Sequence, residues 1–249
     1  QCYSEDSNSS SDYFTKLADE KQKNKDFREA ISYVSCAIDL DPVDDWLYAK
    51  RSYLFLELDM IDAAMNDINR AIFLKDGNYY YHQLRGFILY RAQDYPGAIK
   101  SFESAVQLNP EDYYSFYLAG SSKKSLKDIS GAIGSFTEAI SLKPSDPHLY
   151  FSRGLSWQEI GESSKAIDDF SRAINIEPGD SLLYINRGFL YNILGNYELA
   201  LADFDSAINI DPQNDYAYGL RASVKSNILD SEGAISDYSI AISINKDSD

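Results

Sequence analysis

Apolar residues recur at steps of three and four over residues 98–108, where the chain reads AIKSFESAVQL. This spacing places Ala98, Phe102, Ala105 and Val106 on one face of an amphipathic helix. A second helical stretch, YHQLRGFILYRAQ, precedes it and breaks near QDYPG. The proline of the following LNP ends the downstream helix, because a residue before proline is pushed out of the helical region. The pattern predicts a helix, a turn, a second helix and a stop.

The same phrase returns 34 residues later as AIGSFTEAISLKP, and further copies run along the whole chain. Two ladders of alanine advance by 34 residues: Ala30, Ala64, Ala98, Ala132, Ala166, Ala200 and Ala234, and Ala37, Ala71, Ala105, Ala139, Ala173, Ala207 and Ala241. Five copies close with a proline, at Pro42, Pro110, Pro144, Pro178 and Pro212. Seven units fit in register: 11–44, 45–78, 79–112, 113–146, 147–180, 181–214 and 215–248.

One helical hairpin cannot bury its own apolar faces, so a chain of identical hairpins stacks them against one another. We therefore predict an all-α fold, with residues 1–10 as a flexible Ser/Asp-rich tail and residues 11–248 as one solenoid domain. The alanine ladders, with glycines at Gly86, Gly120, Gly154 and Gly188, mark places where two helices approach too closely for a larger side chain.

The 34-residue period, the paired alanine ladders and the closing proline occur with an aromatic position held by Phe102, Phe136, Phe170, Phe204 and Tyr238. This combination resembles the tetratricopeptide repeat family over essentially the whole chain. The resemblance implies a right-handed superhelical solenoid of seven helix-turn-helix repeats, whose first helices line a concave groove. It also implies a binding scaffold and not a catalyst.

The chain departs from the commonest pattern of the family at one position, and there it resembles an Arg-Gly subtype of the repeat. Arginine stands where leucine is usual, at Arg51, Arg85, Arg153, Arg187 and Arg221. Four of these five repeats carry an aspartate sixteen residues later. We predict structural, bidentate ion pairs between the two helices of one hairpin, Arg51–Asp67, Arg153–Asp169, Arg187–Asp203 and Arg221–Asp237. The alternative is an arginine row that binds anionic ligands.

A stripe on the first helices, at repeat positions 2, 5, 9 and 12, is not explained by stacking. It should be mainly polar if it meets only water, yet it is rich in aromatic residues between residues 46 and 117. The family resemblance places this stripe on the groove, and rigid rings give a large contact area at little cost in ordering. The predicted peptide-binding residues are Trp46, Tyr53, Tyr80, Gln83, Phe87, Tyr90, Tyr114, Tyr117 and Phe151. The alternative is that the tyrosines only pack between neighbouring first helices.

The last repeat leads to a second prediction. Repeat arrays usually need a polar cap, whereas the seventh second helix carries Tyr238, Ile240, Ile242 and Ile244. Either the native chain continues, or this helix meets another protein. The alternative function is therefore a structural assembly module that forms a homodimer through its C-terminal repeat.

Charge and hydropathy narrow the choice of partners to a protein or peptide. The 39 acidic and 23 basic residues give a net charge of -16, which repels nucleic acid and anionic lipid at long range. No run of 18 apolar residues occurs, so we predict no membrane span.

Candidate chemistry is sparse. The two histidines, His82 and His148, have no recognisable nucleophile or metal-ligand arrangement around them, and no phosphate-binding glycine loop occurs. We predict no enzymatic activity, no metal and no cofactor. Cys2 and Cys36 pair if the compartment is oxidising, and otherwise stay free thiols. A cytoplasmic location is preferred, with export or lipid anchoring as the alternative that Cys2 and the polar tail leave open.

Overall fold

The structure, a computed structural model, describes residues 10–246, which form fourteen α-helices and no strand. The first helices of the hairpins are α1 (Ser11–Lys23), α3 (Asp45–Glu57), α5 (Tyr79–Arg91), α7 (Tyr113–Ser125), α9 (Pro147–Glu159), α11 (Ser181–Ile193) and α13 (Asp215–Asn227). The second helices are α2 (Phe27–Leu40), α4 (Ile61–Leu74), α6 (Tyr95–Leu108), α8 (Ile129–Leu142), α10 (Ser163–Ile176), α12 (Tyr197–Ile210) and α14 (Ser231–Lys246). The all-α prediction of seven helix-turn-helix repeats is confirmed, and each first helix begins at the first residue of a predicted repeat.

Every first helix is capped by the residue before it. The seven caps share a side-chain oxygen that accepts a hydrogen bond from a backbone N–H of the first turn, which satisfies a donor that has no partner within the helix. They are Ser10, Asp44, Asn78, Asp112, Asp146, Asp180 and Asn214. The repeat therefore has a polar ladder in addition to its apolar ones.

The turn between the two helices of a hairpin uses a left-handed residue at one repeat position. The residues with positive φ are Lys25, Asp59, Gln93, Lys127, Gly161, Gly195 and Leu229. Such a residue commonly ends a helix, and glycine is the residue that adopts this conformation without a steric cost. Two repeats have glycine there, whereas Leu229 adopts a φ of 65°.

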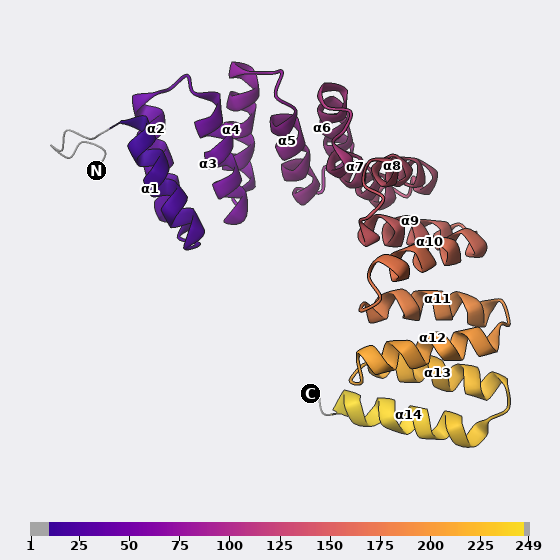
Figure 1. The fold of residues 1–249 in the computed structure, drawn as a ribbon. Helices are drawn as coiled ribbons and strands as arrows, with labels where there is room; N and C mark the ends of the chain where they lie inside the picture. The colour runs from indigo at the N-terminus through magenta and orange to yellow at the C-terminus, as the bar shows by residue number, and fades with distance from the viewer. Residues whose placement is uncertain (1–9, 247–249) are drawn as a thin grey trace. The chain divides into compact units, whose positions relative to one another are not determined.

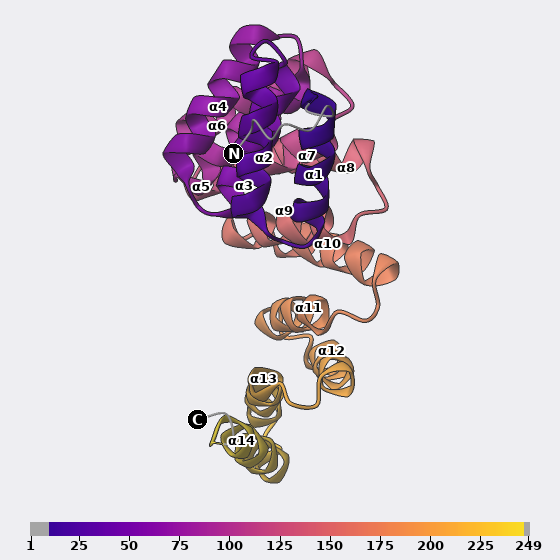
Figure 2. The same ribbon diagram turned by 90° about the vertical axis from the view of Figure 1, so that its left-hand side faces the viewer.

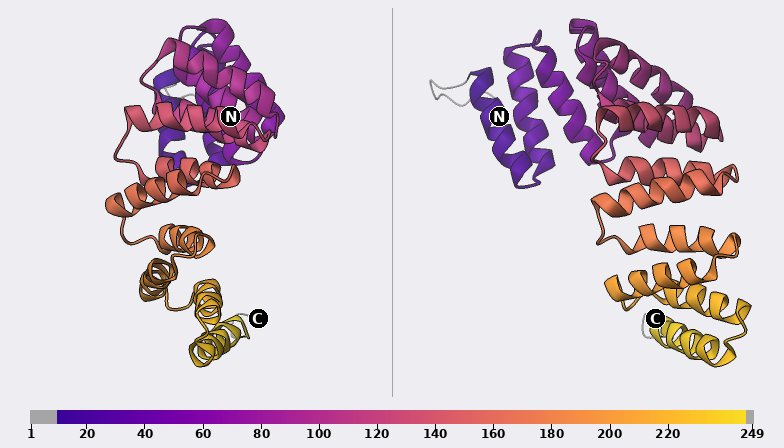
Figure 3. Two further views of the ribbon diagram at one scale, coloured as in Figure 1. Left: turned by 90° about the vertical axis from the view of Figure 1, so that its right-hand side faces the viewer. Right: turned by 45° about the vertical axis from the view of Figure 1, so that its right-hand side comes forward.

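The chain divides into two compact units between Gly131 and Ala132, a point that lies within α8. In the first unit α1 pairs with α2, α3 with α4 and α5 with α6, and each hairpin packs on the next through α2 with α3 and α4 with α5 (Figures 1 and 2). In the second unit α9 pairs with α10, α11 with α12 and α13 with α14, and α10 packs on α11 and α12 on α13 (Figure 3). Whether residues 11–248 behave as one domain stays a prediction.

The core of each hairpin is built from the residues of the sequence ladders. Ala64, Ala98 and Ala166 are fully buried, as are Phe102 and Phe170. A Cβ atom added at Gly86 would lie 2.6 Å from Cε1 of Phe102, and one added at Gly154 would lie 2.8 Å from Cε1 of Phe170. These glycines therefore let the first helix approach the aromatic ring of the second.

Candidate functional site

The predicted aromatic stripe in the first unit begins with three residues at the second position of successive first helices. Trp46 of α3, Tyr80 of α5 and Tyr114 of α7 are separated by 34 residues each. Helix α5 contacts both α3 and α7, and the rings of Trp46 and Tyr80 lie 6.0 Å apart between centroids. Trp46 is 48% exposed and Tyr114 is 41% exposed, whereas Tyr80 is half-buried. We call Trp46, Tyr80, Tyr114 and Tyr117 the aromatic surface.

The next turn of these helices divides the predicted set by burial. Tyr117 stacks on Tyr114, with centroids 6.1 Å apart and an angle of 25° between the rings. Tyr53, Phe87 and Tyr90 are half-buried and pack against the hydrophobic core. Each of these three side chains therefore contributes to packing between hairpins, and only part of its surface is open to a ligand.

Several tyrosines of this region have a raised pKa. Burial raises the pKa of Tyr80, Tyr90 and Tyr114. Burial, together with a hydrogen bond to Glu57, raises the pKa of Tyr53 to about 12. A neutral phenol both donates and accepts hydrogen bonds, so these tyrosines can contact the amide groups of a polypeptide.

Gln83 uses its amide group within the protein. Its Nε2 donates a hydrogen bond of 2.7 Å to Oδ2 of Asp112, the buried cap of α7, and lies 3.4 Å from Oγ of Ser115. The contact joins α5 to the beginning of α7. Gln83 therefore positions two first helices that carry the aromatic surface.

The remaining predicted groove residue, Phe151 of α9, belongs to the second unit and is described there alone. It is half-buried, and its ring lies 5.9 Å from that of Phe170. It also packs beside Leu183 and Ala173. Its role in ligand binding stays a prediction.

Two cavities of the first unit have linings that include none of the four residues of the aromatic surface. One of about 690 Å³ is lined by Phe14, Ile31, Tyr33 and Cys36, among others. Another of about 420 Å³ is lined by Arg28, Ile31, Phe55 and Met60 with Leu58. Cys36 is buried, and Cys2, with which it is predicted to pair, lies outside the described residues.

The last described helix exposes an apolar face. Tyr238 is 44% exposed and Ile242 is 56% exposed, Ile240 lies at 36%, and Ile244 is half-buried. Ile235, which the sequence analysis did not include, is 67% exposed on the same helix. Ile235, Tyr238 and Ile242, three and four residues apart, form one exposed face of α14, and Ile240 lies on another side of the helix.

The four predicted arginine–aspartate pairs all adopt the bidentate geometry. In each, Nε and Nη2 of the arginine donate to the two carboxylate oxygens of the aspartate at 2.7–2.9 Å. The hydrogen bond to the aspartate raises the pKa of each of these arginines although burial opposes it. The arginines thus join the two helices of their own hairpins.

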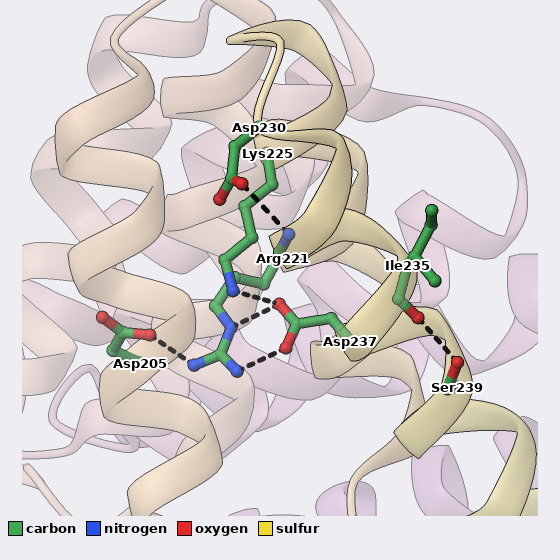
Figure 4. A network of polar contacts seen from close by, with 8 residues as sticks. Asp205, Arg221, Lys225, Asp230, Ile235, Asp237 and Ser239 are labelled. Atoms are coloured by element: carbon green, nitrogen blue, oxygen red, sulfur yellow. Dashed lines mark hydrogen bonds and ion pairs between the residues drawn. The ribbon is translucent and has the colours of Figure 1, made fainter.

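A third hydrogen bond from the same arginines was not anticipated. Nη1 donates to a residue sixteen positions earlier, on the second helix of the preceding repeat: Ser35, Thr137, Ser171 and Asp205. Figure 4 shows Arg221 between Asp205 of α12 and Asp237 of α14. Each arginine therefore connects three helices. The oxygen-bearing residue at that position is the sequence signal that could have revealed this contact.

The histidines contribute to local structure. The backbone N–H of His148 donates to Oδ1 of Asp146, the cap of α9. Nε2 of His82 donates to the carbonyl oxygen of Asp76 at 2.8 Å. Among the residues that the structure describes, no group of three or more His, Cys, Asp or Glu side chains is arranged to hold a metal ion.

Comparison with known proteins identifies the repeat. The tetratricopeptide repeat family matches residues 79–112 and residues 181–214, which are two of the units marked out by the sequence ladders. These two units are tetratricopeptide repeats. No curated protein matches the chain significantly.

Several solved tetratricopeptide repeat structures share the fold. The C-terminal part of a repeat-containing protein from Cytophaga hutchinsonii has a TM-score of 0.81 at 18% identity, covering 93% of this chain and 95% of that one. A protein from Parabacteroides merdae has a TM-score of 0.69 at 17% identity, covering 94% and 93%. YrrB, described as having an unusual peptide-binding site, has a TM-score of 0.64 at 23% identity, covering 74% and 95%. At these identities the likeness shows the fold alone.

The repeats and the fold support the general role of a protein-interaction scaffold with a protein or peptide partner. Tetratricopeptide repeat proteins are generally non-catalytic scaffolds. None of the helices in the described part of the chain is long and apolar enough to cross a membrane.

Proposed function

We propose that this protein binds a peptide segment of a partner protein on the aromatic surface of α3, α5 and α7. The observation that carries the proposal is the exposure of Trp46 and Tyr114, at 48% and 41%, at equivalent positions of helices that both contact α5. Packing between the first helices does not require such large side chains to remain open to solvent. Exposed aromatic groups of this kind are typical of binding surfaces.

The chemistry of the surface favours an extended, uncharged or weakly polar segment. Trp46 and Tyr114 supply apolar area, and the phenols of Tyr80 and Tyr114 can donate and accept hydrogen bonds. The hydrogen bond between Gln83 and Asp112 holds α5 to the beginning of α7, so this part of the surface is pre-organised and less free energy is lost in ordering it when a ligand binds. YrrB, a protein of the same fold, is described as binding a peptide at an unusual site.

The test is peptide selection followed by quantitative binding. Peptides selected on the wild-type chain from a random library are labelled and titrated by fluorescence polarisation. Replacing Trp46 and Tyr114 together with alanine should weaken binding at least about a hundredfold, because interface aromatics each contribute about 2 kcal/mol or more. Both side chains are substantially exposed, so circular dichroism should show that the variant stays folded.

The matched control is Tyr216→Ala. Tyr216 occupies the same repeat position in α13 and is 60% exposed, but it lies outside the aromatic surface. This variant should bind the selected peptides as the wild type does. Equal affinity in Trp46→Ala/Tyr114→Ala and the wild type would refute the proposal.

The exposed face of α14 supports a second candidate function, self-association through a second copy of the chain. Ile235, Tyr238 and Ile242 are all more than 40% exposed, and an isologous contact would cover the apolar face on both copies at once. Light scattering on a size-exclusion column should then show a dimer that Ile235→Asp and Ile242→Asp dissociate. Ile193→Asp, at an isoleucine of α11 that is 59% exposed, is the control. If the wild type is a monomer at all concentrations, self-association through α14 is ruled out.

A further inference from the structure

Arg85 of α5 is the fifth arginine of the ladder, and it differs from the other four in its partners. Where those repeats carry aspartate, this one carries Ser101. Nε of Arg85 donates to Oγ of Ser101 at 3.1 Å, and Ser101 is itself buried and donates to the carbonyl oxygen of Gly97. No carboxylate in the described part of the chain is hydrogen-bonded to the guanidinium of Arg85.

The outer nitrogens of Arg85 are also less occupied than in the other repeats. Nη2 lies 3.5 Å from Nδ1 of His82, a long contact. Nη1 of the other four arginines bonds to a residue of the preceding second helix. The counterpart for Arg85 is Asn69 of α4, an exposed residue to which the structure assigns Arg85 no hydrogen bond. The guanidinium thus keeps donors that its counterparts use.

The charge of Arg85 is balanced only from a distance. Asp76 is the acidic residue whose charge raises the pKa of Arg85. The side chain of Asp76 is 83% exposed, and its Oδ1 lies 3.1 Å from Nε2 of His82. Burial lowers the pKa of Arg85, whereas a carboxylate raises the pKa of Arg51 and the three other paired arginines. A partly buried cation without a hydrogen-bonded counter-ion is stabilised when an anion binds to it.

We propose that Arg85 binds a carboxylate supplied from outside the chain through its two outer nitrogens, Nη1 and Nη2, because Nε is already bonded to Ser101. In the four equivalent sites an aspartate of the chain itself accepts two hydrogen bonds of 2.7–2.9 Å from the arginine. The guanidinium fork matches the spacing of two carboxylate oxygens. Two sources share this chemistry, a small free carboxylate and the side chain of Asp or Glu on a partner protein. The site is separate from the aromatic surface and goes beyond the proposed function.

The test follows the arginine Nε–Hε signals of the ¹⁵N-labelled full chain by NMR, with Arg85 assigned from Arg85→Lys. Sodium acetate is titrated against sodium chloride at equal ionic strength, and in a second arm the tripeptide acetyl-Gly-Glu-Gly-amide replaces acetate. We expect a saturable shift of the Arg85 signal with the carboxylate and not with chloride. The signals of Arg51 and Arg187 should not move, because their forks are filled.

Filling the fork from within the chain should abolish the response. In Ser101→Asp the aspartate occupies the place of Asp67 in the second repeat, and carboxylate affinity should fall at least about tenfold because the aspartate accepts from Nη2 and neutralises the guanidinium. Asn69→Asp is a second, independent variant, which reproduces the 2.5 Å contact between Asp205 and Arg221. It approaches Arg85 from α4, so the test does not depend on one substitution folding well.

Ser104→Asp is the matched control, since it adds the same charge three residues later on α6 and leaves the fork open. It should bind the carboxylate within about twofold of the wild type, because Ser104 is partly exposed and a charge outside the fork is screened by salt. If the tripeptide binds more strongly than acetate, the carboxylate comes from a side chain of a partner protein. If acetate binds as strongly as the tripeptide or more strongly, the ligand is a small free carboxylate. An unmoved Arg85 signal in both arms, or an equal loss in Ser104→Asp and Ser101→Asp, would overturn the proposal.

Discussion

Arg187 donates two hydrogen bonds to Asp203, at 2.9 Å from Nε and 2.7 Å from Nη2, across one helical hairpin. Nη1 donates a third, of 2.9 Å, to Ser171 in the preceding repeat. The side chain of Asp203 is 7% exposed and that of Arg187 is 19% exposed. The pair is therefore shielded from solvent, and its geometry joins α10, α11 and α12.

Removing the carboxylate should be costly. Asp203→Ala leaves a mostly buried guanidinium without its counter-ion, and losing one partner of such a pair lowers the free energy of unfolding by about 3 kcal/mol. Urea unfolding followed by circular dichroism measures the change. Asp205→Ala on the same helix is the control: Asp205 is 54% exposed in its contact with Arg221, so its loss should cost below about 1 kcal/mol. Equal losses of unfolding free energy in the two variants would show that the buried Arg187–Asp203 pair stabilises the fold no more than the exposed contact does.

The glycines of the first helices allow a second prediction. Ala at Gly86 would place Cβ 2.6 Å from the ring of fully buried Phe102, and overpacking of this kind costs about 1–3 kcal/mol. Gly219, within α13, has open space around a Cβ, so Gly219→Ala should stabilise the chain by about 0.5–1 kcal/mol. Urea midpoints of the two variants should therefore move in opposite directions. A stabilised Gly86→Ala would contradict the close packing of α5 on Phe102.

The repeat bounds could be predicted from the sequence because both alanine ladders run through all seven repeats. A closing proline in five repeats and a glycine in four recur at constant offsets, so the copies together correct the ambiguity of any one. The arginine–aspartate pairs could be predicted for the same reason, since Arg187 and Asp203 repeat their spacing in three other hairpins.

The exposure of the aromatic residues could not be predicted in this way. Trp46 and Tyr80 hold the same repeat position, yet Trp46 is 48% exposed and Tyr80 is half-buried beside it. Their burial depends on the neighbouring hairpin and not on the repeat. Gln83 likewise bonds to Asp112, 29 residues away, and this spacing belongs to none of the ladders. Contacts that occur once leave no periodic signal.

The left-handed turn residues provide a third prediction. Leu229 adopts a φ of 65° and is 87% exposed, so its side chain adds little packing to offset the strained backbone. Leu229→Gly should raise the free energy of unfolding by about 1 kcal/mol, because a left-handed residue with a Cβ costs about 1–2 kcal/mol. Gly195 holds the same turn position with φ 76° and no atom near a Cβ, so Gly195→Ala should cost a similar amount. Urea unfolding of both variants tests this, and a destabilised Leu229→Gly would show that the leucine packs usefully.

The last prediction concerns acid stability. Burial alone would raise the pKa of Asp237, but hydrogen bonds from Arg221 and Lys225 outweigh burial and lower it. Its side chain is 3% exposed, and both cations lie within 2.8 Å of its oxygens. A carboxyl whose pKa is lower in the folded chain binds fewer protons there. Its contribution is complete above the unfolded pKa of about 3.9 and is lost as pH falls through the folded value.

Asp237→Asn removes this contribution at every pH. The difference in unfolding free energy between wild type and variant should therefore be largest near pH 7 and shrink once the pH falls below about 4. Urea midpoints measured across that range give the difference directly. The control is Glu232→Gln, at an exposed residue in the first turn of α14. Its unfolding free energy should stay close to that of the wild type across the same pH range. A difference that stays constant down to the lowest pH would show that protonation of Asp237 is not coupled to folding.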